Sequence, residues 1–69
     1  MNDKVYKKIE LTGTSSESQE AAIQNAVQKA SKTLHNLRWF EVVESRGSIK
    51  DGKVDQYQVT LKIGLTLDD

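Results

Sequence analysis

The chain has 69 residues, enough for one small domain, and we treat residues 1–69 as a single unit. Ten basic and ten acidic side chains give a formal net charge of zero, which argues against a protein that holds nucleic acid mainly through its phosphates. There is no cysteine, and this excludes disulfides, cysteine zinc sites and thiol nucleophiles.

Small size predicts self-association. A domain of about 60 residues buries only about 60% of the surface that its unfolded chain exposes, so a single core of this size is marginally stable. No apolar run reaches the ~18 residues of a membrane span, and Met1 leads directly into a strand pattern without a secretory signal. We therefore expect a cytoplasmic homo-oligomer with no membrane partner.

The first predicted element is a strand over residues 5–11, where apolar and polar side chains alternate. A helix follows. Ser16 and Gln19 fit a capping box at its start, and its apolar spacing extends to about Leu34. The predicted buried stripe consists of Ile23, Val27, Ala30 and Leu34, with Ala22 and Ala26 beside it.

Two further strands are predicted over residues 37–50 and 53–67, joined at Asp51-Gly52. An Asp-Gly pair between alternating runs indicates a two-residue hairpin with a type I′ turn, in which both residues have positive φ. Continued without a break from the turn, this register pairs Trp39 with Gly64, Phe40 with Ile63, Glu41 with Lys62, Val42 with Leu61, Val43 with Thr60 and Ser45 with Gln58.

The register separates two faces of the hairpin. The apolar face must lie under the helix, and it carries Phe40, Val42, Tyr57, Val59, Leu61, Ile63, Leu65 and Leu67. The other face has no helix to cover it, because the chain supplies only one, and it carries Trp39, Glu41, Val43, Ser45, Gln58, Thr60 and Lys62. We expect Glu41 and Lys62 to form a cross-strand ion pair.

Trp39 is the unusual residue of the uncovered face. Its indole has nothing in its own subunit to bury it, and Gly64 opposite leaves space beside the ring. Spacing alone leaves two interpretations open, a contact with another copy and a stacking platform for a flat ligand. Gln58 points from the same face and either contacts a heterocycle edge or is solvated. Alternation sends Arg46 to the helix side, where a charge fits poorly unless the sheet extends beyond the helix or Gly47 marks a bulge that redirects the side chain. An ordinary surface Arg is the simpler interpretation.

Catalysis and metal binding find no support in the sequence. His35 is the only imidazole and has no second His or Cys beside it, so neither a metal site nor a His-based catalytic pair is expected. We see no general base, nucleophile or substrate cleft, and we expect a protein that is not an enzyme.

The ordered motifs of the chain resemble the dodecins, small flavin-binding proteins of bacteria and archaea. They are Leu11-Thr12-Gly13-Thr14-Ser15, Lys32-Thr33-Leu34, Trp39-Phe40-Glu41-Val42 and Tyr57-Gln58-Val59, and they cover nearly the whole chain. The resemblance implies an α+β, β-α-β-β fold in which a three-stranded antiparallel sheet packs on one helix. It also implies twelve copies in a hollow homododecamer.

The resemblance also implies a ligand. Dodecins bind flavins (FMN, riboflavin or FAD) in pairs between subunits, stacked on tryptophans at the position of Trp39, with a Gln at the position of Gln58 bonding the ring edge. Arg46 matches a basic residue near the ligand in bacterial members, which favours the bulge. Some members bind coenzyme A, whose residues no motif assigns. Leu65 and Thr66 depart from the bacterial pattern, which has an aromatic and a basic residue there, so a phosphate contact at that point stays unassigned.

The function implied is storage of flavin and quenching of its photochemistry by the indole. Two alternatives from other classes stay open. One is a flavin-dependent oxidoreductase, which the absence of acidic or His candidates near Trp39 disfavours. The other is a structural homo-oligomer or base-stacking nucleic-acid-binding module, and zero net charge disfavours the nucleic-acid version.

Overall fold

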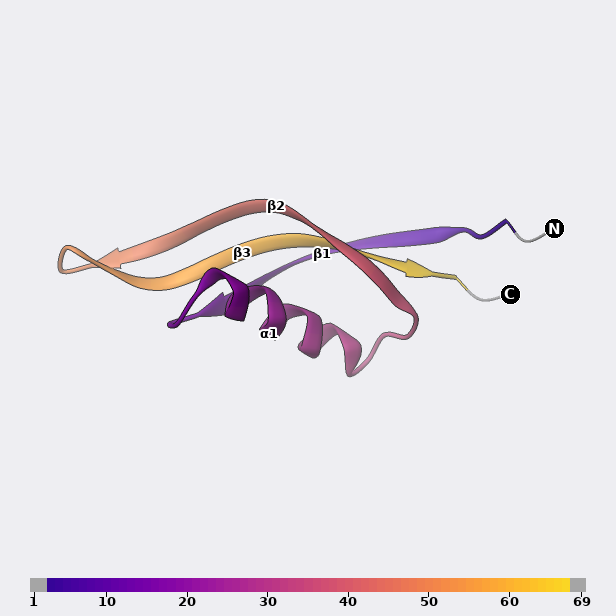
Figure 1. The fold of residues 1–69 in the computed structure, drawn as a ribbon, viewed down its shortest axis with the longest axis horizontal. Helices are drawn as coiled ribbons and strands as arrows, with labels where there is room; N and C mark the ends of the chain where they lie inside the picture. Colours follow the sequence, from indigo (N-terminus) through magenta and orange to yellow (C-terminus); the bar gives the residue numbers. More distant parts are fainter. Residues whose placement is uncertain (1–2, 68–69) are drawn as a thin grey trace.

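The computed structural model describes residues 3–67, which form one helix and three strands (Figure 1). In chain order the elements are β1 (Tyr6–Ser15), α1 (Gln19–Ser31), β2 (Leu37–Lys50) and β3 (Lys53–Thr66). Both strand pairs are antiparallel and β3 lies in the middle, in the order β1-β3-β2. The predicted α+β class with β-α-β-β order is confirmed.

The start of α1 differs from the prediction. The N-cap is Ser18, whose side chain accepts a hydrogen bond of 3.0 Å from the backbone N–H of Ala21. A capping box of Ser16 with Gln19 is therefore wrong, because Gln19 is already the first helical residue. The helix ends at Ser31, three residues before the expected Leu34.

The core lies between α1 and the central strand. Three alanines at four-residue spacing face the sheet, and they meet the buried side chains of β3: Ala22, Ala26, Ala30, Val59, Leu61 and Ile63. The predicted helix stripe is partly wrong, since Ile23, Val27 and Leu34 are only partly buried at the margin of this cluster. The side chains of α1 that face the sheet are small because the helix lies so close to the sheet that larger helix side chains would not fit.

The helix covers β1 and β3 and leaves β2 uncovered. Phe40 and Val42 were expected under the helix, but they are 49% and 47% exposed, and so is Leu67 at 47%. The strand order explains the error, because β3 separates β2 from the strand that leads into the helix.

The hairpin extends well beyond the helix and makes the protomer elongated (Figure 1). The molecule measures 56 × 20 × 13 Å, and its radius of gyration of 14.4 Å exceeds the about 11 Å of a compact chain of this length. Asp51 and Gly52 have φ angles of 54° and 75°, which confirms the predicted turn. No helix of the described residues is long and apolar enough to cross a membrane.

Candidate functional site

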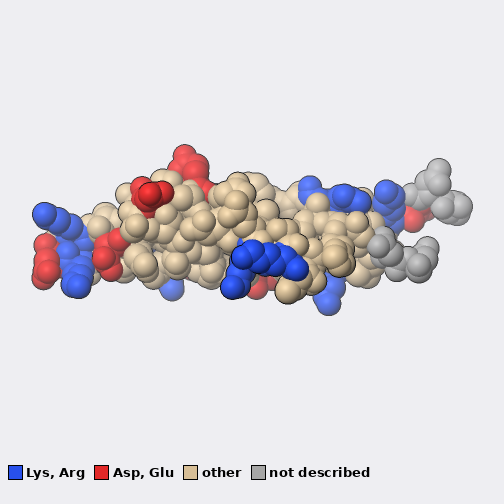
Figure 2. Space-filling view, turned by 90° about the horizontal axis from the view of Figure 1, so that it is seen from below, with Lys and Arg blue, Asp and Glu red and all other residues tan. Residues whose placement is uncertain are grey.

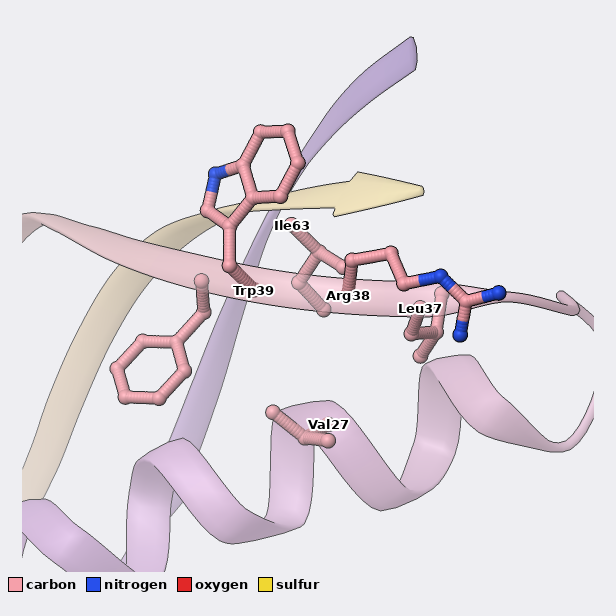
Figure 3. A pocket seen from close by; sticks show the side chains of 6 residues that line it. Val27, Leu37, Arg38, Trp39 and Ile63 are labelled. Carbon is pink, nitrogen blue, oxygen red and sulfur yellow. The ribbon is translucent and has the colours of Figure 1, made fainter. Parts of the chain in front are cut away.

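Trp39 stands on the side of β2 that faces away from α1 (Figure 3). It pairs with Gly64 of the central strand, as predicted, and Gly64 pairs on its other side with Lys8 of β1. A Cβ placed on Gly64 would lie only 2.3 Å from Cε2 and Cζ2 of the indole and 2.6 Å from Cδ2. Two of these atoms belong to the bond shared by both rings, so the indole lies with one face on Gly64.

Tyr6 packs against the same indole. The two ring centroids are 4.9 Å apart with an interplanar angle of 64°, an edge-to-face contact of the kind that aromatic pairs prefer. With Gly64 under one face and Tyr6 packed against the ring, 39% of Trp39 remains exposed. The structure thus presents a flat aromatic surface whose position is fixed by Gly64 and Tyr6.

Gly64→Ala is expected to displace the indole. The added methyl would occupy the space of the six-membered ring, and the ring must lift or rotate because the sheet backbone beneath is fixed by hydrogen bonds on both sides. We predict a shift in tryptophan fluorescence and a weaker near-UV circular dichroism signal. Trp39 is the only tryptophan, so both signals report this site alone. Unchanged spectra would show that the indole does not lie on Gly64.

An ion pair lies beside the indole on the same face. Lys8 Nζ donates to Glu41 Oε1 at 2.9 Å, so the partner of Glu41 is Lys8 and the expected pair with Lys62 is wrong. Lys8 and Glu41 pair with Gly64 and Lys62 of the central strand, two positions apart, so the ion pair crosses β3 diagonally. The hydrogen bond and the charge of Lys8 lower the pKa of Glu41 below its ordinary 4.5, and the charge of Lys62 lowers it further.

Glu41→Gln is expected to change stability in a pH-dependent way. Because the pKa of Glu41 is lower in the folded state, its carboxylate stabilises the fold above the unfolded value of 4.5, and this contribution is lost as the pH falls through the folded pKa. Denaturation midpoints of the wild type and the variant should differ slightly at neutral pH and converge once the pH falls below the folded pKa of Glu41. Lys8→Met should show the same convergence. A difference that grows on acidification would contradict the pairing.

Arg46 and Gln58 form a second polar cluster on this face. They are direct partners across β2 and β3, and Arg46 Nε donates to Gln58 Oε1 at 2.8 Å. The register shift between Val42 and Glu44 makes this possible, because Val43 is an extra residue that turns all following side chains over. The bulge that redirects Arg46 lies at Val43, and a bulge at Gly47 is wrong because Gly47 pairs regularly with Tyr57.

The same bulge corrects two predicted pairs. Thr60 pairs with Glu44 where Val43 was expected, and Ser45 pairs with Val59 and lies on the helix side. There its hydroxyl accepts a hydrogen bond from the Gln19 side chain of α1. Glu44 takes a place on the uncovered face, with its Oε1 3.8 Å from Nη1 of Arg46.

Trp39 and the Arg46–Gln58 pair lie far apart within one protomer. Gly64 and Gln58 are six positions apart on β3, which corresponds to about 20 Å along a strand. This is longer than a ring system of three fused rings. A single flat ligand therefore contacts both groups only if they come from two copies of the chain.

Sequence reasoning missed Tyr6, Lys8 and Arg38 as neighbours of Trp39. Aligning β1 with β3 would have found the first two, since they pair with Thr66 and Gly64. Arg38 sits in a second irregularity of β2, and its Nε donates to Thr66 Oγ1 at 3.0 Å. A basic group therefore reaches the Thr66 position from the neighbouring strand.

An apolar hollow of about 150 Å³ lies at the gap between β2 and α1 (Figure 3). Six residues line it: Val27, Leu37, Arg38, Trp39, Phe40 and Ile63. The indole itself rises on the opposite side of the strand. The hollow is consistent with a strand that lacks cover on its helix side as well as on its outer side.

The charges of the helix-side view show no continuous basic band (Figure 2). Acidic and basic side chains are interspersed near the hairpin end, and basic groups in the middle and toward the other end are separated by uncharged surface. Binding carried by phosphate contacts depends on clustered Lys and Arg side chains. This face offers no support for the nucleic-acid alternative.

Comparison with known proteins identifies the family. The sequence profile of the Dodecin family matches residues 5–68. A dodecin of Thermus thermophilus is 56% identical over 66 residues, which cover 96% of each chain. The structure of dodecin from Streptomyces coelicolor has a TM-score of 0.95 at 45% identity, covering 100% of this chain and 99% of that one. Dodecin from Streptomyces davaonensis gives 0.94 at 47% identity, covering 99% and 100%. The chain belongs to the dodecin family.

Proposed function

We propose that this protein binds a flavin between copies of itself, stores it, and quenches its photochemistry through Trp39. The observation that carries the proposal is the indole that lies with one face on Gly64 and remains 39% exposed. An isoalloxazine stacked on the indole gains about 1 kcal/mol beyond the burial of its area, and a second indole on the far side adds to this. Riboflavin, FMN and FAD share this ring system.

Assembly of copies is part of the proposal. β2 is exposed along its whole length apart from its half-buried Leu37 and Ser48, and its large apolar side chains include Phe40, Val42, Val43 and Ile49. An uncovered strand of this kind favours association with another chain. The separation of Trp39 from Gln58 points the same way, since one ligand contacts both only at a junction of copies. The implied assembly is the homododecamer.

Quenching follows from contact between the two rings. An excited flavin takes an electron from the electron-rich indole, and return of that electron restores both rings to their ground states. The flavin is thereby protected from other photochemical reactions. Glu41 is the acid nearest along the strand, and its lowered pKa makes it a weak base, which disfavours the oxidoreductase alternative.

A titration of riboflavin and FMN into ligand-free protein tests the proposal. We expect loss of flavin fluorescence on binding and a particle mass of twelve chains by light scattering. Retained fluorescence at saturation would refute quenching, and absence of binding would refute the proposal as a whole. Steady oxidation of a nicotinamide donor would favour the flavin-dependent oxidoreductase. Salt-dependent binding of an oligonucleotide would favour the base-stacking nucleic-acid-binding module.

Gln58→Ala is expected to weaken flavin binding by about 1–2 kcal/mol, the usual cost of leaving a polar ligand edge unpaired. Gln56→Ala is the matched control, because Gln56 lies on the same face two pairs further from Trp39, opposite Ser48. Calorimetry on both variants gives the comparison. Equal losses in the two variants would show that Gln58 makes no specific contact.

A further inference from the structure

The hydrogen bond between Arg46 and Gln58 fixes the orientation of an amide. Arg46 Nε lies 2.8 Å from Gln58 Oε1, and a guanidinium has donors only. The amide atom facing Arg46 must therefore be the carbonyl oxygen, and the NH₂ group is the end that does not face Arg46. Without Arg46 the amide could turn over, because its two ends have the same shape.

Arg46 is poorly placed to bind an anion itself. Its Nη1 lies 3.8 Å from the carboxylate of Glu44, and both side chains are more than half exposed, at 61% and 55%. The carboxylate offsets the positive charge and repels a second anion such as a phosphate. The Nε–H, the group nearest the sheet, is already committed to Gln58. The role left for Arg46 is to donate a hydrogen bond to Gln58.

We infer that Arg46 is a positioning residue, which holds the Gln58 amide so that its NH₂ group faces the ligand. The inference rests on the proposed function and adds a chemical requirement to it. The ligand edge at Gln58 must offer acceptors, such as the carbonyl oxygens and ring nitrogens of a flavin. Arg46 then contributes equally to the affinity for flavins with and without a phosphate, because it acts on the ligand only through the Gln58 amide.

A double-mutant cycle with two ligands tests this inference. The proteins are the wild type, Arg46→Met, Gln58→Ala and the double variant, each titrated with riboflavin and with FMN. We expect Arg46→Met to weaken both ligands by the same factor, about fivefold to tenfold. In the Gln58→Ala background the same change should alter affinity less than about twofold. Lys50→Met, an exposed change of equal charge on the same strand, should leave both affinities unchanged.

Other outcomes overturn the inference. A larger loss for FMN than for riboflavin would show that Arg46 binds the phosphate directly. An equal loss in the presence and absence of Gln58, or no loss at all, would show that it does not act through the amide. If Arg46→Met fails to assemble, Arg46→Leu and Arg46→Gln are compared in the same cycle. Binding by the wild type distinguishes these outcomes from failure of the proposed function, since a wild type that binds no flavin refutes both.

Discussion

Trp39→Ala is expected to abolish tight flavin binding while the chains still assemble. The substitution removes the only large aromatic face that the described outer surface of the sheet presents beside Tyr6. Truncation of a central tryptophan at a binding site costs about 2–4 kcal/mol, or about 30-fold to 1,000-fold in affinity. Titration by flavin fluorescence measures the loss, and light scattering measures the particle mass.

Trp39→Phe separates stacking from quenching. A phenyl ring keeps a flat apolar surface on Gly64, so we expect an intermediate affinity. Phenylalanine is a poor electron donor, and bound flavin should therefore regain part of its fluorescence. If Trp39→Ala instead breaks the assembly into smaller particles, the indole serves as a contact between copies, and the alternative left open by the sequence is the correct one.

The sequence predicted the hairpin and the place of Trp39 because local rules govern both. Asp51 and Gly52 specify a turn, and the turn fixes the pairs nearest to it. The pair of Trp39 and Gly64 also came out correctly, although the register between it and the turn is broken. Two irregularities cancel over that distance, since β2 carries an extra residue at Val43 and β3 an extra residue at Asp55.

The middle of the hairpin could not be predicted for the same reason. Alternation of polar and apolar residues is the only register signal between Val42 and Ser48, and this segment is polar on both sides. A bulge costs little where neither face is buried under the helix. The hydrogen bond between Arg46 and Gln58 depends entirely on that bulge, because only the shifted register makes the two residues direct partners.

The sequence pattern also did not predict correctly which residues of the helix are buried against the sheet. Large apolar side chains on α1 suggested the buried stripe, but burial depends on how closely two elements approach. Ala22 and Ala26 face the sheet because Gly13 of β1 lets the helix backbone come near. Ile23 and Val27 are left partly buried at the side where β2 has no cover.

Gly13→Ala is expected to destabilise the fold more than any other single methyl addition considered. A Cβ at this position would lie 2.1 Å from the backbone carbonyl oxygen of Ala22 and 2.8 Å from the Cβ of Ala26. No side-chain rotation relieves a contact with backbone, so α1 must move away from β1. Overpacking of this kind costs about 2–3 kcal/mol.

Gly52→Ala is the reference for the Gly13 measurement. Gly52 has a φ of 75° and open space around its Cα, so its substitution carries a conformational cost of about 1 kcal/mol and no collision. Chemical denaturation of both variants gives the comparison. A loss at Gly13 no larger than that at Gly52 would mean that the helix can lift from the sheet at little cost. In that case the close approach would not be what selects alanine on the buried side of α1, and the half-buried Ile23 and Val27 would need another explanation.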